Sequence, residues 1–444
     1  MVAAGITHRY RGADVVVSDV KGKRKSGRAV DADSPSFDWI ADIESLEAFI
    51  DFALEHAAYA IDTEFLRERT YYPNLALVQI SVAGRTVLID PLAMPVTALN
   101  RLFESNSVAV FHAADQDLEV LELACNSVPS TMFDTQLAAG FLGFSTPSLV
   151  SLVERVLGVR LSKGDRLTDW TIRPLTDAQC AYAASDVTHL LELRQLLLAE
   201  LAPIGRVQWV VDETELMRLR PRGQQDPQRA WWRLKDGRVL RGNDRLIAQE
   251  LCAWRERRAQ SEDRPVRYVM ADLAVVAISQ AKPATVTALT AIRGVDGRAA
   301  RASVAHEILA VVERAKQMDP SELLVPEVED FDRRLRPALT LVSAWIGQLA
   351  QDARIDQSIL ATRGDLVQFL RHDEGARLRQ GWRASLVGEN IGLLVDGGAA
   401  LAFEPSGTLI LEHRSDRPIE LMVSAPQASW TEPTPDAGPT GISD

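Results

Sequence analysis

The chain contains only three cysteines among its 444 residues, and they lie far apart, at positions 125, 180 and 252. This spacing suits neither a zinc site nor a disulfide framework, so we expect a protein of a reducing compartment, the cytoplasm. The sequence also lacks any run of about eighteen apolar residues, and we therefore expect no membrane-spanning helix and no membrane partner. Residues 1–35 contain no apolar core of signal-peptide length, which argues against secretion.

Positive charge is also in short supply. Lys and Arg total 49 against 61 Asp and Glu, which gives a formal net charge of −12. This balance counts against a nucleic-acid partner, because phosphates are bound by Lys and Arg. Local patches can override a global sum, however, and a metal site built from carboxylates itself contributes negative charge. A hydrophobic content of 46% is ordinary for a globular protein, and the length favours about three domains.

The stretch Tyr59–Phe65 organises the rest of the chain. It reads as a short apolar strand, Tyr59–Asp62, that ends in the acids Asp62 and Glu64. Residues two apart on a strand point to the same face, so the two carboxylates are close and repel each other. A divalent cation would relieve this repulsion, because hard cations take oxygen ligands. Such acid pairs also occur on solvated strands, and the pair alone does not decide between the two readings.

The segments around this strand predict an α/β sheet with helices on its faces. Strand patterns at Leu75–Val82 and Thr86–Asp90 flank Gly84 and indicate a hairpin, and Val108–Phe111 indicates a further strand. Helical spacing occurs at Ile43–Leu54, Leu99–Phe103 and Asp115–Ala124, and Asp134-Thr135 is a cap for one more helix.

A second acidic cluster, Phe111–Glu119, spans the end of one predicted strand and the start of a helix. Open α/β sheets bind ligands beyond the carboxyl ends of their strands. Asp115 and Asp117 are two apart at the start of this helix, so they cannot both face one site. One of them is then an ordinary partner of the helix dipole, and the residues alone do not say which.

A third cluster lies on a helix whose start is marked by a capping box, with Thr176 as cap and Gln179 three residues later. We expect this helix to continue to about Leu201, with Leu190, Leu193, Leu197 and Leu201 in one apolar stripe. Tyr182 and Asp186 extend that stripe toward the helix start. They are either the wall of a cleft or, taken singly, a packing residue and a solvated acid.

Three ordered motifs emerge from these clusters. They are Asp62-Thr-Glu64-Phe with Arg67–Leu75 and Gln79, Phe111-His112-Ala-Ala-Asp115-Gln-Asp117-Leu-Glu119, and Tyr182-Ala-Ala-Ser-Asp186 preceded by Thr168-Asp-Trp170 and Arg173-Pro-Leu175. Over about Asp38 to Ala202, this order resembles the DEDD exonuclease superfamily, and within it the ribonuclease D family. The resemblance implies a mixed-sheet, ribonuclease-H-like exonuclease domain followed by small helical domains.

The resemblance also implies the roles of the acids. It selects Asp117 rather than Asp115 and predicts the catalytic set Asp62, Glu64, Asp117, Tyr182 and Asp186. The four acids would bind two divalent ions, Mg²⁺ or Mn²⁺, which activate water and stabilise the leaving oxygen in an in-line displacement. Tyr182 lies four residues before Asp186, which indicates the tyrosine branch of the superfamily, and its phenol would orient the attacking water. His189 does not match the position of the histidine branch and is interpreted as structural.

Six further residues are predicted to hold the substrate: Arg67, Arg69, Tyr71, Tyr72, His112 and Trp170. Single-stranded RNA is bound by basic groups on its phosphates and by aromatic rings under its bases. The alternative for the Tyr-Tyr-Pro turn and for Trp170 is packing at the edge of the core, since aromatic residues fill cores far more often than they stack on bases.

The remaining boundaries follow from composition and from the same resemblance. We predict a disordered basic tail at 1–35, the exonuclease domain at 36–205, a linker and connecting helix at 206–240, a helicase-and-ribonuclease-D C-terminal (HRDC) module at 241–318, a linker at 319–334, a second HRDC-like domain with short strands at 335–425, and a disordered tail at 426–444. Within the last domain, Ile391–Val395, Ala400–Phe403 and Thr408–Glu412 read as strands. The basic tail is either an RNA-contacting arm or a plain leader.

A group of arginines in the predicted HRDC module presents a further choice. Arg255, Arg257, Arg258, Arg264 and Arg267 form either a phosphate-binding face or an ordinary solvated helix surface.

Taken with these features, the resemblance implies a metal-dependent 3′→5′ exoribonuclease that releases nucleoside 5′-monophosphates. The expected substrates are tRNA precursors and single-stranded 3′ ends, and the expected assembly state is a monomer. Two alternatives stay open at this point: the same chemistry on DNA, and a nucleic-acid-binding protein without activity.

Overall fold

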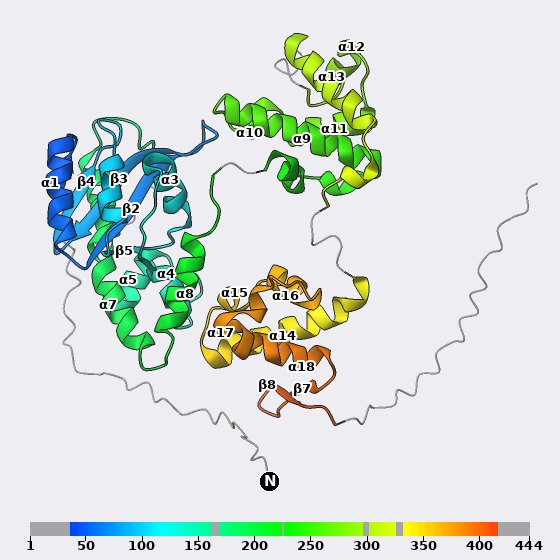
Figure 1. The fold of residues 1–444 in the computed structure, drawn as a ribbon. Helices are drawn as coiled ribbons and strands as arrows, with labels where there is room; N and C mark the ends of the chain where they lie inside the picture. Colours follow the sequence, from blue (N-terminus) through cyan, green and yellow to red (C-terminus); the bar gives the residue numbers. More distant parts are fainter. Residues whose placement is uncertain (1–35, 162–167, 224–225, 296–301, 326–331, 416–444) are drawn as a thin grey trace, which may run out of the picture.

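The computed structural model describes residues 36–161, 168–223, 226–295, 302–325 and 332–415. The predicted tails at 1–35 and 426–444 and part of the predicted linker at 319–334 lie outside these ranges. The described chain forms three regions, which Figure 1 shows in sequence colours: a sheet region from β1 to α8, a first helical region from η2 to η4, and a second helical region from η6 to β8.

The sheet region is built on a mixed sheet in which the strands follow the order β1-β4-β3-β2-β5-β6. Its strands are β1 (Asp38–Ile40), β2 (Ala58–Leu66), β3 (Asn74–Val82), β4 (Arg85–Ile89), β5 (Val108–Phe111) and β6 (Met132–Asp134). The β2–β3 and β3–β4 pairs are antiparallel, and the β1–β4, β2–β5 and β5–β6 pairs are parallel. The predicted mixed sheet with an internal hairpin is therefore confirmed.

Helices cover both faces of this sheet. They are α1 (Ile43–Leu54), η1 (Thr97–Leu99), α2 (Asn100–Phe103), α3 (Asp115–Cys125), α4 (Thr135–Gly140), α5 (Leu149–Leu157), α6 (Asp177–Thr188), α7 (Leu190–Leu201) and α8 (Val207–Arg218). Ile61, Val78 and Ile80 on one face pack against α1, α2 and α3. Alternation sends Leu77 and Leu88 to the opposite face, where they meet the alanines of α6.

Strand β2 is longer than its apolar residues suggested. It continues through both acids to Leu66, with a bulge between Glu64 and Phe65. The prediction that the strand ends at Asp62 was therefore wrong. Pairing with β3 continues to Leu66, and it holds Asp62 and Glu64 in a strand although acidic side chains do not favour one. β5 pairs with β2 only from Ala58 to Ala60, so the half that bears the acids projects past the end of β5.

The helix that begins with the Thr176–Gln179 capping box is interrupted. The capping box is present, with Thr176 accepting from the backbone N–H of Gln179. The helical conformation then breaks at His189, which ends α6 and begins α7, so the prediction of one continuous helix to Leu201 was wrong. The predicted leucine stripe of α7 is buried as expected. The break lies directly after the stretch that carries Tyr182 and Asp186.

The first helical region is centred on the long helix α9, against which η2 and α13 pack. Its elements are η2 (Pro227–Arg233), η3 (Gly237–Val239), α9 (Asn243–Ser261), α10 (Val266–Val269), α11 (Asp272–Ala281), α12 (Val286–Thr290), α13 (Ala302–Lys316) and η4 (Pro320–Glu322). Ile247 and Leu251 of α9 are fully buried in a core shared with α11 and α13. This region has a core of its own, as a separately folded module requires.

The second helical region ends in a small hairpin. Its elements are η6 (Arg333–Leu335), α14 (Arg336–Ala353), α15 (Gln357–Leu360), α16 (Arg363–Leu370), η7 (Arg377–Arg379), α17 (Gly381–Arg383), the π-helical turn η8 (Ala384–Gly388), α18 (Glu389–Val395), β7 (Ala399–Phe403) and β8 (Leu409–His413). Two of the three predicted strands are present as β7 and β8. The third prediction, a strand at Ile391–Val395, was wrong: the segment is helical in α18 and buries Ile391 and Leu394, which are three apart, on one side. A short apolar run does not distinguish a buried helix from a strand.

The second helical region shares one continuous core with the sheet region. The Trp382 ring stacks on the Trp209 ring of α8 at a centroid distance of 4.8 Å and meets Phe141 edge-on. The guanidinium of Arg206 donates to the carbonyl oxygens of Phe141 and Ala353, one from each region. Figure 1 shows this region beside α8, away from the first helical region. The sheet region and the second helical region are therefore packed against each other through a common hydrophobic core.

None of the helices in the described part of the chain combines the length and apolarity that crossing a membrane requires.

Candidate metal centre and active site

Three carboxylates meet on the α6 face of the sheet. Oxygen atoms of Asp62, Glu64 and Asp186 all lie within 4.8 Å of one another. Asp62 and Glu64 reach this point because they alternate with Ile61 and Thr63 along β2. Asp186 reaches the same point from helix α6, because α6 packs across β2, β3 and β4 on this face of the sheet. All three side chains are half-buried, so the cluster is a recessed site with access from solvent.

Helix α6 also carries Tyr182, one turn before Asp186. Its ring lies beside the Trp170 ring, at a centroid distance of 6.2 Å. The small residues Ala183 and Ala184 of this turn are fully buried against Leu77 and Leu88, so α6 approaches the sheet closely. This close approach places Asp186 over the acids of β2, with Tyr182 one turn earlier on the same helix.

Asp117 joins the site from the side. Its Oδ1 accepts hydrogen bonds from both the backbone N–H and the hydroxyl of Thr63, at 3.2 and 2.6 Å. This is possible because β2 projects past β5 and leaves the Thr63 N–H available to α3. Asp115 points away and forms an exposed ion pair with Arg220 at 2.8 Å. The structure thus brings Asp117, and not Asp115, to the acids of β2.

The start of α3 is itself held by Asp134. One carboxylate oxygen of Asp134 caps α4 by accepting from Leu137, and the other accepts from the N–H of Ala114. Ala113 in the same turn adopts a left-handed conformation, with φ 65°. This turn directs the first residues of α3 toward β2. The capping role of Asp134 was predicted from the sequence, but its bond to Ala114 was not.

Burial and mutual repulsion disfavour ionisation of the clustered acids. Burial, followed by the charges of Asp117, Asp186 and Glu64, raises the pKa of Asp62 well above its ordinary value. Burial and the charges of Asp186 and Asp117 raise the pKa of Glu64 to about 8. For Asp117, burial outweighs the hydrogen bonds from Thr63 and raises its pKa to about 7. Acids crowded in this way need positive charge between them in order to ionise together.

The donor set fits a hard divalent cation. All the converging ligand atoms are carboxylate oxygens, which are the ligands that Mg²⁺ and Mn²⁺ prefer. A dication would offset the repulsion that raises the carboxylate pKa values. The same set lacks the thiolates and imidazoles that are typical of a zinc site.

Comparison with known proteins agrees with this geometry. Residues 37–202 match the family described as 3′-5′ exonuclease, and residues 244–312 match the HRDC domain. A ribonuclease D from a Jannaschia species is 36% identical over 388 residues, which are 84% of this chain and 99% of the relative. A ribonuclease D from Nitrobacter hamburgensis is 37% identical over 363 residues, 80% of this chain and 94% of the relative.

The chain belongs to the ribonuclease D family. Among solved structures, Escherichia coli RNase D, described as an exoribonuclease involved in structured RNA processing, superposes with a TM-score of 0.73 at 28% identity. The match covers 81% of this chain and 99% of that one. The chain is therefore a 3′→5′ exoribonuclease with an HRDC domain, it acts on RNA, and its acidic cluster is that of a divalent-metal enzyme.

The predicted substrate-binding residues of the chain lie in different environments. Arg67 forms an ion pair with Glu119 of α3, and Arg69 lies 3.5 Å from Asp169. The Arg69 side chain is 73% exposed and the Arg67 side chain 45% exposed. They come from the loop that follows β2, which the figures show reaching from the sheet toward the first helical region.

Tyr71 and Tyr72 neither pack into the core nor lie free on the surface. The Tyr71 hydroxyl donates to Glu256 of α9 at 2.6 Å, and the N–H groups of both tyrosines donate to Asp263. Their rings meet edge-on at 5.0 Å. Neither of the two roles considered from the sequence anticipated this junction, because the partners are about 190 residues away.

His112 is half-buried and Trp170 is buried. The two ring nitrogens of His112 lie 2.9 Å from the Thr135 hydroxyl and 3.1 Å from the Pro147 carbonyl oxygen. Burial lowers the pKa of His112. Trp170 is 4% exposed and packs with Leu77, Leu88 and Ala184, so the packing alternative describes its surroundings. A role of either residue under an RNA base stays a prediction.

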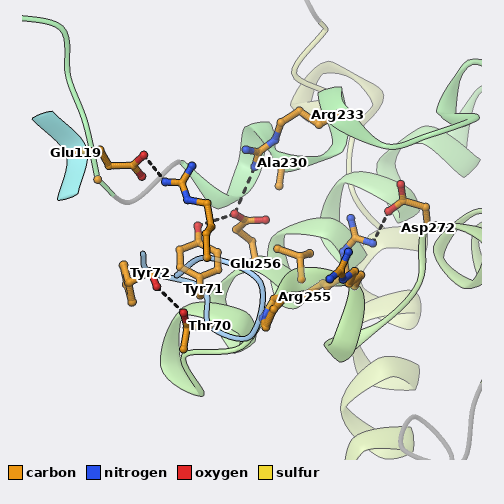
Figure 2. Close-up of a pocket in the computed structure, with 14 residues that line it drawn as sticks. Thr70, Tyr71, Tyr72, Glu119, Ala230, Arg233, Arg255, Glu256 and Asp272 are labelled. Atoms are coloured by element: carbon orange, nitrogen blue, oxygen red, sulfur yellow. Dashed lines mark hydrogen bonds and ion pairs between the residues drawn. The ribbon is translucent and has the colours of Figure 1, made fainter. Parts of the chain in front are cut away.

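A cavity of about 490 Å³ lies where the loop after β2 meets the first helical region. Figure 2 shows residues that line it. Arg67 and Tyr71 line it from the loop, and Arg233 and Arg267 from η2 and α10. In the view, Tyr71 points toward Glu256. Arg255 forms an ion pair with Asp272 in the same view. The cavity therefore combines basic, acidic and aromatic side chains from two regions, and Arg67, Arg233 and Arg255 each pair with one of its carboxylates.

One member of the predicted arginine face has another role. Arg255 is 5% exposed, donates to the Met270 carbonyl oxygen and forms a 2.6 Å ion pair with Asp272. It holds α9 to the start of α11, and the reading of Arg255 as part of a surface was wrong. The sequence of α9 could not show that Arg255 is buried, because its ion-pair partner, Asp272, lies on another helix.

The positioning role of Arg173 was also missed. Its guanidinium binds the Asp90 carboxylate at 2.8 Å through two nitrogens and donates to the carbonyl oxygens of Ala76 and Trp170. It thereby fixes the segment before α6 to the edge of β3. The motif Arg173-Pro-Leu175 marked the position, but its partners are 83 and 97 residues away.

Proposed function

We propose that Asp62, Glu64, Asp117 and Asp186 bind two divalent ions, Mg²⁺ or Mn²⁺, and that this centre removes nucleotides one by one from RNA 3′ ends. The products are nucleoside 5′-monophosphates. The observation that carries the proposal is the convergence of three carboxylates within 4.8 Å on a recessed face, with Asp117 beside them. Divalent ions at such a centre activate the attacking water and stabilise the leaving oxygen.

The protein side chains supply orientation. Asp62 and Glu64 are fixed by β2, and Thr63 between them holds the carboxylate of Asp117. Tyr182 presents its phenol from the same turn as Asp186. In the proposal it donates or accepts the hydrogen bond that orients the water for in-line attack on the last phosphate.

The RNA strand is held by the loop after β2 together with the first helical region. Arg67 and Arg69 are exposed on the loop that directly follows the acids of β2, and the cavity of Figure 2 extends from Arg67 to Arg267. Proteins commonly bind single-stranded RNA with basic side chains on its phosphates and aromatic rings stacked on its bases. In this proposal, residues 36–205 catalyse the hydrolysis, and the helical domains at 241–318 and 335–425 bind and support the RNA substrate.

The substrate class is structured RNA with a single-stranded 3′ end, tRNA precursors in particular. This extends to the chain what is said of Escherichia coli RNase D, an exoribonuclease involved in structured RNA processing. The proposal includes a monomer as the active form and the cytoplasm as its location.

The test uses the full-length protein with a 3′-labelled tRNA precursor, Mg²⁺ or Mn²⁺ in separate reactions, and a matched DNA oligonucleotide. Asp62→Asn and Asp186→Asn should abolish nucleotide release while the melting temperature stays close to that of the wild type. Asp115→Asn is the control, because Asp115 pairs with Arg220 at the surface. Full activity of either site variant would overturn the role of that acid, and faster release from DNA would overturn the choice of RNA.

A further inference from the structure

A buried amide next to the acidic cluster has no partner. Gln79 lies in the middle of β3 and is 0% exposed. Among the described residues, neither its amide nitrogen nor its amide oxygen forms a hydrogen bond. A buried amide without partners is unfavourable, and an apolar residue would fill the position better unless the amide has a use.

The register of the sheet places Gln79 directly opposite Asp62. The two residues face each other across the antiparallel β2–β3 pair, and Leu88 of β4 lies on the other side of Gln79. Directly opposed side chains on one face have Cβ atoms about 5 Å apart, which is within reach of a glutamine amide. Gln79 therefore lies beneath α6 on the same face as the clustered acids.

Two other polar groups on β3 and next to β4 already have partners. The Ser81 hydroxyl, two residues along β3, accepts from the Thr86 hydroxyl at 3.1 Å. The Asp90 carboxylate binds Arg173. Glu64 lies opposite Leu77, one diagonal step from Gln79, whereas Asp62 is the direct neighbour. The carboxylate of Asp62 is therefore the acceptor that the position of Gln79 favours.

We propose that Gln79 is a positioning residue for the metal centre, and that its amide N–H donates to the ionised carboxylate of Asp62. The bond would fix the rotation of that carboxylate and leave its second oxygen to face the cation. Groups that hydrogen-bond to metal-bound ligands orient them in this way and support the charged form. The proposal rests on the proposed function, because it assumes that Asp62 is a metal ligand.

The test compares full-length wild type and Gln79→Met, which keeps the length of the side chain but removes the amide. Mn²⁺ binding is measured by calorimetry, and melting temperatures are measured with EDTA and with saturating Mn²⁺. The Kd for Mn²⁺ should rise about 10- to 100-fold. The melting temperature in EDTA should stay equal or rise, because an unpartnered amide is removed, while the increase caused by Mn²⁺ should shrink.

Ser81→Ala is the matched control, since Ser81 is buried on the same strand and face. It should leave the Kd for Mn²⁺ unchanged. In an Asp62→Asn background, Gln79→Met should have no further effect on the Kd. An unchanged Kd in Gln79→Met, or a loss of stability that is equal with EDTA and with Mn²⁺, would overturn the role of Gln79 alone. Absence of Mn²⁺ binding by the wild type would overturn both this role and the proposed metal centre.

Discussion

The hydroxyl of Tyr71 donates a 2.6 Å hydrogen bond to the carboxylate of Glu256, although the two residues are 185 positions apart in the sequence. Tyr71 belongs to the loop that leaves the catalytic strand, and Glu256 to the central helix of the HRDC region. Asp263 reinforces the junction by accepting from the N–H groups of Tyr71 and Tyr72. The first helical region, which contains the HRDC domain, thus fixes the loop that carries Arg67 and Arg69 and that directly follows the strand of the acids.

Removing the Tyr71 hydroxyl should loosen this junction. In Tyr71→Phe, Glu256 keeps its buried position but loses a charge-assisted hydrogen bond, which costs about 1.5–3 kcal/mol. We expect faster hydrogen exchange in the loop at 67–73 and a higher KM for RNA with kcat little changed. Hydrogen exchange followed by mass spectrometry, together with steady-state kinetics, measures both effects.

Tyr59→Phe is the control for the same chemical change. The Tyr59 hydroxyl is buried in the core and has no partner among the described residues, so its loss should leave exchange in the loop unchanged. Equal exchange in Tyr71→Phe and wild type would contradict the junction's role in holding the loop.

The metal-free protein should become less stable as the pH rises. The pKa of Glu64 is raised to about 8 and that of Asp117 to about 7 in the folded state, above their ordinary values. A carboxyl whose pKa is raised by folding contributes stability below its unfolded pKa, and this contribution is lost as the pH rises through the folded pKa. In EDTA the melting temperature should therefore fall between about pH 5 and pH 8.

Saturating Mn²⁺ should reduce or reverse this fall, because the cation binds the ionised carboxylates. Glu64→Gln removes one of the titrating groups and should make the slope in EDTA shallower. If the melting temperature in EDTA instead rises from pH 5 to pH 8, burial and mutual repulsion do not raise the pKa values of these acids. Thermal denaturation at a series of pH values provides the measurement.

The junction between the sheet region and the second helical region depends on a buried ion pair. Glu213 of α8 pairs with Arg377 and Arg383, and Glu213 and Arg383 are both almost fully buried. Glu213→Ala leaves Arg383 buried without its counter-charge, so the free energy of unfolding should fall by about 3–5 kcal/mol. Glu215→Ala, on the exposed side of the same helix, removes only a surface pair with Arg218 and should cost less than about 1 kcal/mol. Urea denaturation of both variants distinguishes a buried pair from a surface one.

Local features of this fold could be predicted well from the sequence. The hairpin at Leu75–Val82 and Thr86–Asp90, the helix at Ile43–Leu54 and the capping box at Thr176 each depend on residues close in the chain. The convergence of Asp62 and Glu64 followed from strand alternation, and their meeting with Asp186 from the family resemblance.

Features that depend on distant partners could not be predicted in this way. Strand β2 extends through the acids because β3 pairs with it, and Ile391–Val395 is helical because two of its residues enter the core of the second helical region. Tyr71 contacts Glu256, and Arg255 contacts Asp272. Each contact joins two different elements, and the residues near either partner in the sequence do not indicate it. The sequence therefore identified the chemistry more completely than the surfaces that present RNA to it.

Arg267 offers a test of where the RNA lies upstream of the acids. It is exposed on α10, lines the cavity of Figure 2, and lies with its guanidinium 5.1 Å from the centre of the Tyr268 ring. Arg257 is also exposed but does not line this cavity, which makes Arg257→Ala the matched control. If Arg267 binds a phosphate, Arg267→Ala should raise KM, leave kcat unchanged, and lower the slope of log Kd against log salt by about one. Filter binding of RNA to metal-free protein at several salt concentrations measures that slope, and equal slopes in the two variants would mean that the strand does not pass this cavity.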